Sequence, residues 1–86
     1  MDLRHMELKD TASMMLSEDY KERFRAEYGQ LRLRYQKLKS MLDKWDQGMM
    51  DFEPACPRSI YNMQIRAMED YIAVLEARAV MEDIVL

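Results

Sequence analysis

Residues Tyr20 to Trp45, YKERFRAEYGQLRLRYQKLKSMLDKW, decide the fold of this chain. Apolar and aromatic side chains recur in this stretch at successive spacings of 4, 4, 3, 4, 3, 4 and 3 residues. Such heptad-like spacing places them along one side of an α-helix, as in the seam of a coiled coil. The seam consists of Tyr20, Phe24, Tyr28, Leu31, Tyr35, Leu38, Leu42 and Trp45. The stretch therefore predicts one long amphipathic helix that packs against a partner helix.

The partner helix is expected after the one substantial loop of the chain. Gly48 is a residue type that ends helices, and Pro57 is tolerated in the first turn of a new helix. We expect one helix over about residues 18–47, a loop at about 48–56 and a second helix over about 57–83. Residues 17–86 are thus predicted to form an all-α hairpin of two long antiparallel helices.

The first 16 residues are predicted to be an N-terminal extension with a short helix. We expect that helix at about Thr11–Leu16, with Asp10 as its N-cap. Ser17 is the expected N-cap of the first long helix, because the acidic residues that follow it suit the positive end of the helix dipole.

The second long helix carries two adjacent apolar rows. One row consists of Tyr61, Ile65, Met68, Ile72, Leu75 and Ala79. The other consists of Ile60, Ala67, Tyr71, Val74 and Met81, with Gln64 and Arg78 as its polar members. A hairpin offers only one partner face, so one row is expected to stay uncovered unless another copy of the chain packs on it. The pattern therefore predicts assembly into a homo-oligomer.

The charge of the chain is unevenly distributed. Residues 20–45 carry eight bases and three acids, whereas the other residues carry five bases and thirteen acids, for a net charge of −3 over 86 residues. Coating of DNA or RNA requires a strongly basic surface, so we expect no DNA partner. No apolar run reaches the roughly 18 residues of a membrane span. The single Cys56 and the absence of a leader-like start favour a cytoplasmic protein.

Catalytic and metal sites find little support in the sequence. The only histidine is His5 and the only cysteine is Cys56, and a Cys–His couple would also need an orienting group and an oxyanion site. The acidic residues are scattered, without the spacing of metal ligands. We therefore expect no enzyme, no metal and no cofactor.

The basic, aromatic helix is the remaining candidate for a binding site. Aromatic rings stack on nucleobases, and Arg and Lys hold phosphates. Arg34 and Lys37 are three residues apart and so share a face. The alternative is an ordinary solvated helix face whose charges bind nothing.

Helix geometry limits how such a site is built. Tyr20 and Arg34 are 14 residues apart and therefore about 21 Å apart along the axis, too far for one small ligand. Two antiparallel copies that cross near Glu27 and Tyr28 bring Tyr20 of one chain to Arg34 and Lys37 of the other. Such a pocket has two-fold symmetry and suits a two-fold ligand.

Two stretches, Tyr20–Leu42 and QIRAMEDYIAVLEAR (Gln64–Arg78), resemble the small phage anti-CBASS sponge proteins, close to their crAss-like-phage-related branch. The resemblance implies a compact hexamer of helical hairpins that sequesters cyclic dinucleotides of the cGAMP type and cyclic trinucleotides without cleaving them. It assigns base stacking to Tyr20 and phosphate contact to Arg34, with Lys37 and Arg23 as helpers. The expected location is the cytoplasm of the infected bacterial host.

The resemblance also implies separate trinucleotide pockets at three-fold junctions, to which no residues are assigned. Position 34 departs from the pattern, since relatives carry Lys where this chain has Arg34; the fork geometry of Arg differs, which bears on ligand preference.

Two other functions stay open. The basic helix suits a protein-interaction module that docks on an acidic partner, which would give no heat with small molecules. A small nucleic-acid-binding regulator would show binding that weakens steeply with salt, but the net charge of −3 disfavours it.

Overall fold

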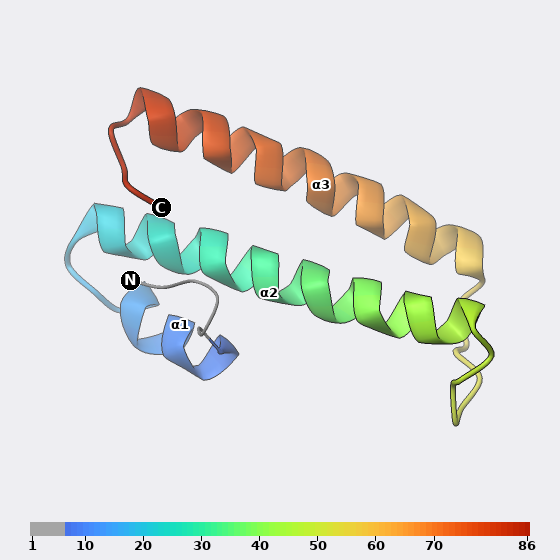
Figure 1. The fold of residues 1–86 in the computed structure, drawn as a ribbon. Coiled ribbons are helices and arrows are strands. Elements are labelled where there is room, and N and C mark those ends of the chain that lie inside the picture. Colours follow the sequence, from blue (N-terminus) through green and yellow to red (C-terminus); the bar gives the residue numbers. More distant parts are fainter. Residues whose placement is uncertain (1–6) are drawn as a thin grey trace.

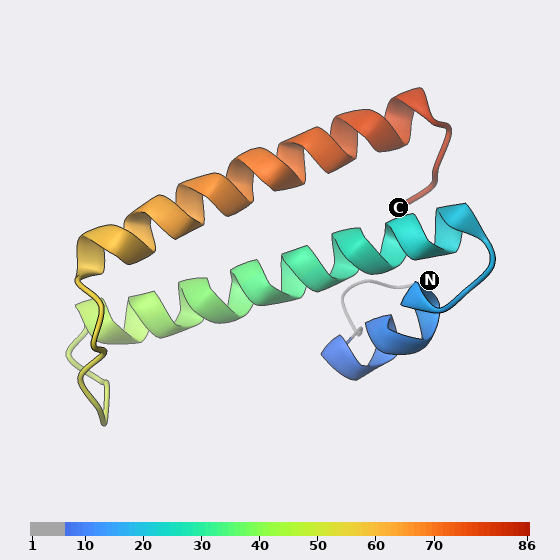
Figure 2. The same cartoon turned by 180° about the vertical axis from the view of Figure 1, so that it is seen from behind.

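The structure, a computed structural model, describes residues 7–86, and this part of the chain contains three helices. They are α1 (Leu8–Met15), α2 (Tyr20–Asp46) and α3 (Arg58–Met81). The two long helices run antiparallel, and α1 packs on the side of α2 that faces away from α3 (Figures 1 and 2). The predicted all-α class, with a short N-terminal helix before two long ones in contact, is confirmed.

Helix α1 begins three residues earlier than the sequence predicts. Glu7 is its N-cap and forms a capping box with Asp10, whose carboxylate accepts the Glu7 backbone N–H at 2.9 Å. Asp10 is therefore the third residue of the helix, whereas the sequence predicted it to be the N-cap.

The first long helix begins at Tyr20 because Asp19, and not the predicted Ser17, is its cap. The Asp19 carboxylate accepts the backbone N–H of Lys21 at 3.0 Å. Ser17 supports this turn from outside: its hydroxyl accepts the Asp19 N–H at 3.1 Å and donates to Glu22 at 3.0 Å. Pro57 likewise precedes α3 as its N-cap and is not the first residue of its first turn.

Both long helices end in the same hydrogen-bonded motif. After α2, Gly48 has φ +71° and its N–H donates to the Trp45 carbonyl, while the Met49 N–H donates to the Lys44 carbonyl at 2.9 Å. After α3, Asp83 takes the left-handed role with φ +58°, and the Ile84 N–H donates to the Ala79 carbonyl at 2.8 Å. This is the Schellman arrangement, which reverses the chain direction directly after a helix.

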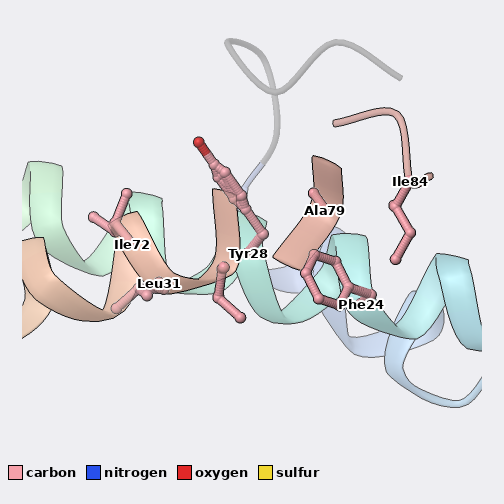
Figure 3. Close-up of a cluster of buried hydrophobic side chains, with 7 residues drawn as sticks. Phe24, Tyr28, Leu31, Ile72, Ala79 and Ile84 are labelled. Carbon is pink, nitrogen blue, oxygen red and sulfur yellow. The ribbon is translucent and has the colours of Figure 1, made fainter. Parts of the chain in front are cut away.

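The reversal after α3 folds the last residues back onto α2 (Figure 1). Ile84 becomes part of the main core, where Figure 3 shows its side chain beside Phe24 and Ala79. The sequence pattern does not predict this buried contact of Ile84, because a single residue after a helix end carries no periodic signal.

The main core lies between α2 and α3, in the half of the hairpin nearest the start of α2. The predicted seam and the first of the two apolar rows supply all of its buried side chains except Ile84, with Tyr35 and Met68 packed at its edge. The buried members are Phe24, Tyr28, Leu31, Ile72, Leu75, Ala79 and Ile84 (Figure 3).

A second, smaller core joins α1 to the opposite face of α2. Met14 of α1 is buried against Ala26, and Thr11 is completely buried with its hydroxyl donating to the Leu8 carbonyl at 2.7 Å. The small residues Ala26 and Gly29, both buried, allow α1 to lie close to α2.

Four tyrosine hydroxyls on the long helices donate hydrogen bonds to glutamates on the opposite side of the hairpin. The contacts recur along its length, so they fix the register of one helix against the other. These Tyr–Glu pairs are Tyr20–Glu82 (2.6 Å), Tyr28–Glu76 (3.2 Å), Tyr35–Glu69 (2.7 Å) and Tyr71–Glu27.

The second apolar row of α3 remains exposed, as its spacing predicts for a lone hairpin. Its large exposed side chains are Ile60, Tyr71, Val74 and Met81, and Met63, which the predicted row did not include, is exposed as well. We call these five residues the α3 apolar row.

Candidate functional site

Tyr20, the residue predicted to stack on a base, lies at the start of α2 and is 46% exposed. The ring packs against the Phe24 ring in an edge-type arrangement, with centroids 6.4 Å apart and planes at 60°. Its hydroxyl donates to Glu82 Oε1 at 2.6 Å and accepts from Arg78 Nη2 at 2.9 Å. The ring is thus accessible from solvent and is held by Phe24 and through its hydroxyl.

Arg78 and Glu82 complete this arrangement from α3. The Arg78 guanidinium lies 5.0 Å above the centre of the Phe24 ring, and its Nε donates to Glu82 Oε2 at 3.0 Å. We call Tyr20, Phe24, Arg78 and Glu82 the hairpin-end cluster. The sequence pattern made Arg78 a polar member of an apolar row and gave Glu82 no role, because contacts about 60 residues apart leave no local pattern.

The electrostatics of the cluster follow from these contacts. The hydrogen bond to the Glu82 carboxylate raises the pKa of Tyr20 above its usual value. The Tyr20 hydroxyl and then the Arg78 guanidinium lower the pKa of Glu82, while Glu82 raises the pKa of Arg78. At neutral pH the cluster therefore holds a neutral phenol, a cation and an anion.

Arg23, one of the predicted helpers, is engaged locally. Its Nη1 donates to the Ser17 carbonyl at 2.7 Å, which ties the connection between α1 and α2 to the long helix. Two neighbouring bases on α2 hold the last residues of the chain in a similar way. Lys21 Nζ donates to the Asp83 carbonyl at 2.9 Å, and Arg25 Nε donates to the Val85 carbonyl at 2.6 Å. The bases at the start of α2 thus hold backbone segments in place.

Arg34 and Lys37, the predicted phosphate contacts, are exposed in the middle of α2. Within residues 7–86 neither side chain takes part in an ion pair or hydrogen bond. They lie one helical turn apart, but Arg34 remains about 21 Å from Tyr20 along the axis. One chain therefore brings Arg34 and Lys37 together and leaves Tyr20 separate from them.

An open groove lies along the second half of α2, beyond the start of α1. Its volume is about 580 Å³, within the range of small-molecule sites. One wall is α2, including Lys37, Ser40 and Lys44, and the other is the loop around Met50 and Phe52. A neighbouring hollow of about 480 Å³ between α1 and α2 also contacts Lys37.

The model of one protein family, Sequestin, matches residues 18–81, most of the chain. The chain belongs to the Sequestin family. The Sequestin region contains α2, the loop and α3, and with them Tyr20, Arg23, Arg34, Lys37 and Arg78. Glu82 and α1 lie outside it. The family name implies non-catalytic sequestration, and it identifies no ligand.

No curated protein and no solved structure matches the chain. Membership of the Sequestin family therefore rests on the match to the family model.

The remaining features of this Sequestin protein are its acidic side chains, its single cysteine and the lengths of its helices. In the part of the chain that the structure describes, no group of three or more His, Cys, Asp or Glu side chains is placed to hold a metal ion. Cys56 is exposed in the loop, while His5, the other half of the couple considered above, lies outside the described residues. Among the helices of residues 7–86, none has both the length and the apolar character needed to cross a bilayer.

Proposed function

We propose that this Sequestin protein sequesters cyclic dinucleotides of the cGAMP type and cyclic trinucleotides, the messengers of CBASS immunity. In this proposal it is a phage protein that acts in the cytoplasm of the infected bacterial host. The observation that carries the proposal is an exposed aromatic ring, Tyr20, anchored at its hydroxyl in a chain of a sequestering family.

Tyr20 supplies the stacking surface for a nucleobase. A ring that is already fixed by Phe24, Arg78 and Glu82 loses little conformational entropy when a base stacks on it. Stacking of one base on one aromatic side chain contributes about 1–3 kcal/mol and is tolerant of base identity. This tolerance suits a protein that takes up more than one messenger.

Arg34 and Lys37 supply the phosphate contacts. The planar guanidinium of Arg34 offers two parallel N–H donors to a phosphate, and Lys37 adds a point charge from the same part of α2. Arg23, held by its Nη1 to the Ser17 carbonyl, is left with a secondary role at the edge of the site.

The site requires two copies of the chain. Because Tyr20 and Arg34 of one chain are about 21 Å apart along the axis, the ring of one copy must meet the bases of another. We propose a homo-oligomer, a hexamer by its resemblance to the anti-CBASS sponges, in which the exposed α3 apolar row is covered. A two-fold pair within it matches the two-fold form of a cyclic dinucleotide.

The ligand is held and is not changed. Sequestration needs only affinity and an excess of sites over messenger, which together lower the concentration of free messenger that the effector meets. No general base or nucleophile is assigned to the site in this proposal.

Isothermal titration of the purified chain with a panel of cyclic di- and trinucleotides tests the proposal, with chromatography of the recovered ligand. We expect heat with at least one member and full return of the intact ligand. Linear product would contradict sequestration, and no heat with any member would refute the proposed ligand class.

Substitutions at Tyr20 and Arg34 test the assignment of the site. Tyr20→Ala should weaken binding by about 10- to 100-fold through loss of stacking, whereas Tyr20→Phe, which keeps the ring, should retain most of it. Arg34→Ala should weaken binding by at least 10-fold, and Lys39→Ala, the loss of another exposed base on α2, should have little effect. Normal binding by both alanine variants would show that the site lies elsewhere.

A protein-interaction module is the second candidate. It is favoured by the exposed bases in the second half of α2, which suit an acidic protein surface. The same titration separates the two functions, because docking on a protein predicts no heat with any cyclic nucleotide.

A further inference from the structure

Glu82 occupies the polar donors beside the candidate stacking ring. One oxygen of its carboxylate accepts the Tyr20 hydroxyl at 2.6 Å, and the other accepts Arg78 Nε at 3.0 Å. A phenol and a guanidinium are also the donors that hold the oxygens of a phosphate. The carboxylate therefore stands where an anionic group of a ligand on Tyr20 would find its hydrogen bonds.

The contact is able to open without unfolding the helix. The Arg78 and Glu82 side chains are 44% and 34% exposed, so both reach solvent. Glu82 is the C-cap of α3, where its backbone N–H donates to the Arg78 carbonyl at 2.8 Å. Rotation of the Glu82 side chain leaves this backbone bond in place, and the Phe24 ring still supports the guanidinium.

We propose that Glu82 is an internal competitor for anionic ligands: it pairs with Arg78 and Tyr20 in the free protein and is displaced when a ligand's anionic group arrives. The inference rests on the proposed function, in which Tyr20 stacks on a nucleotide base. It assigns to Glu82, which lies outside the Sequestin region, control over how tightly that site holds anions.

Electrostatics give the competition its direction. The pKa of Glu82 is lowered by Tyr20 and Arg78, so the carboxylate is ionised at neutral pH and repels a phosphate. A bound anion gains Arg78 only after the existing pair has separated, which reduces its net affinity. Removal of the Glu82 charge should therefore tighten binding.

The test compares Glu82→Gln with the wild-type protein by titration with the cyclic nucleotide panel. Glutamine has the same shape and still accepts the Tyr20 hydroxyl bond, but it carries no charge. We expect the Kd to fall by about fivefold, the scale of one partly screened charge contact. An unchanged or higher Kd would overturn the proposal.

Glu69→Gln is the matched control. Glu69 also accepts a tyrosine hydroxyl across the hairpin, from Tyr35 at 2.7 Å, and its loss changes the net charge equally. Its Kd should stay within about twofold of wild type. If both variants tighten binding equally, the effect is one of total charge and the proposal fails.

A second experiment does not depend on the ligand class. Inorganic pyrophosphate is added to each protein while the NMR resonance of the Arg78 Nε–H is followed. In Glu82→Gln the resonance should shift at about fivefold lower pyrophosphate concentration than in wild type. Equal midpoints for the two proteins would refute the competition by Glu82. If the wild-type protein gives no heat on titration with any cyclic nucleotide, only the proposed function is refuted.

Discussion

At the scale of single residues, Gly48 and Asp83 perform the same task with different chemistry. Each adopts a positive φ one residue past the C-cap of a long helix. Glycine reaches this conformation without strain, whereas a residue with a Cβ is strained there. The two positions therefore predict substitutions of opposite sign.

We expect Gly48→Ala to lower the free energy of unfolding by about 1 kcal/mol and Asp83→Gly to raise it by up to about 1 kcal/mol. No atom lies within 4 Å of a Cβ added at Gly48, so the effect there arises from the backbone alone. Urea denaturation followed by circular dichroism measures both values. A neutral Gly48→Ala would mean that the turn relaxes to another conformation.

The core makes a larger prediction at Leu75, whose side chain is completely buried between the long helices. Leu75→Ala should lower the free energy of unfolding by about 2–5 kcal/mol, because it removes buried methyl groups and leaves a cavity. Val80→Ala, five residues away, exposed and outside the α3 apolar row, is the control and should change it by less than about 0.5 kcal/mol. Equal effects would place the wrong face of α3 against α2.

At the scale of the elements, the Tyr–Glu pairs make the contact between α2 and α3 sensitive to alkaline pH. Hydrogen bonds to carboxylates raise the pKa of Tyr20, Tyr35 and Tyr71, and burial raises that of Tyr28. A raised pKa means that the folded state holds the phenol proton more tightly than the unfolded state does. This stabilisation is complete below the unfolded pKa of about 10 and is lost as pH rises through the folded values.

We therefore expect the free energy of unfolding to fall above about pH 10. Tyr35→Phe removes one of the four groups and should make the decrease shallower. Denaturation midpoints measured between about pH 8 and 11 provide the check. A midpoint that stays constant or rises over this interval would contradict the hydrogen bonds described for the tyrosines.

The elements also show how far the sequence was informative. The spacing of Phe24, Tyr28 and Leu31 predicted the face of α2 that is buried, because core packing repeats with the helix period. The hairpin-end cluster was missed, since Arg78 meets Tyr20 through the register of two helices, and register leaves no mark in either helix alone. Of the four predicted site residues, Arg34 and Lys37 lie one helical turn apart, whereas Tyr20 lies about 21 Å from Arg34 along the axis. Their meeting in a pair of chains is part of our proposal.

At the scale of the whole molecule, the α3 apolar row is the surface that a second copy would cover. Val74 lies within it and is 54% exposed, while Val80, six residues on and 82% exposed, points to another side of the helix. We expect Val74→Glu to dissociate the oligomer and Val80→Glu to leave it intact, because a buried unpaired charge is strongly unfavourable.

Light scattering coupled to size-exclusion chromatography distinguishes these outcomes. The wild-type chain should elute with a mass several times that of one copy. Dissociation by Val80→Glu alone would move the interface to the other side of α3, and a monomeric wild type would contradict self-association.

The bases in the two halves of α2 make different contacts, and this difference affects how fast a ligand arrives. Near the start of the helix, the bases donate hydrogen bonds to backbone carbonyls, which hold these side chains in place; they are Lys21, Arg23 and Arg25. From Tyr28 to Trp45 the only acid is Asp43, and the exposed bases there are Arg34, Lys37, Lys39 and Lys44. The chain is negative overall, yet its field turns positive over this half of α2, which draws an anion in from solution before any contact forms. Capture would then be rapid at low ionic strength and slower as salt screens the field, while release would depend on the short-range contacts at the site.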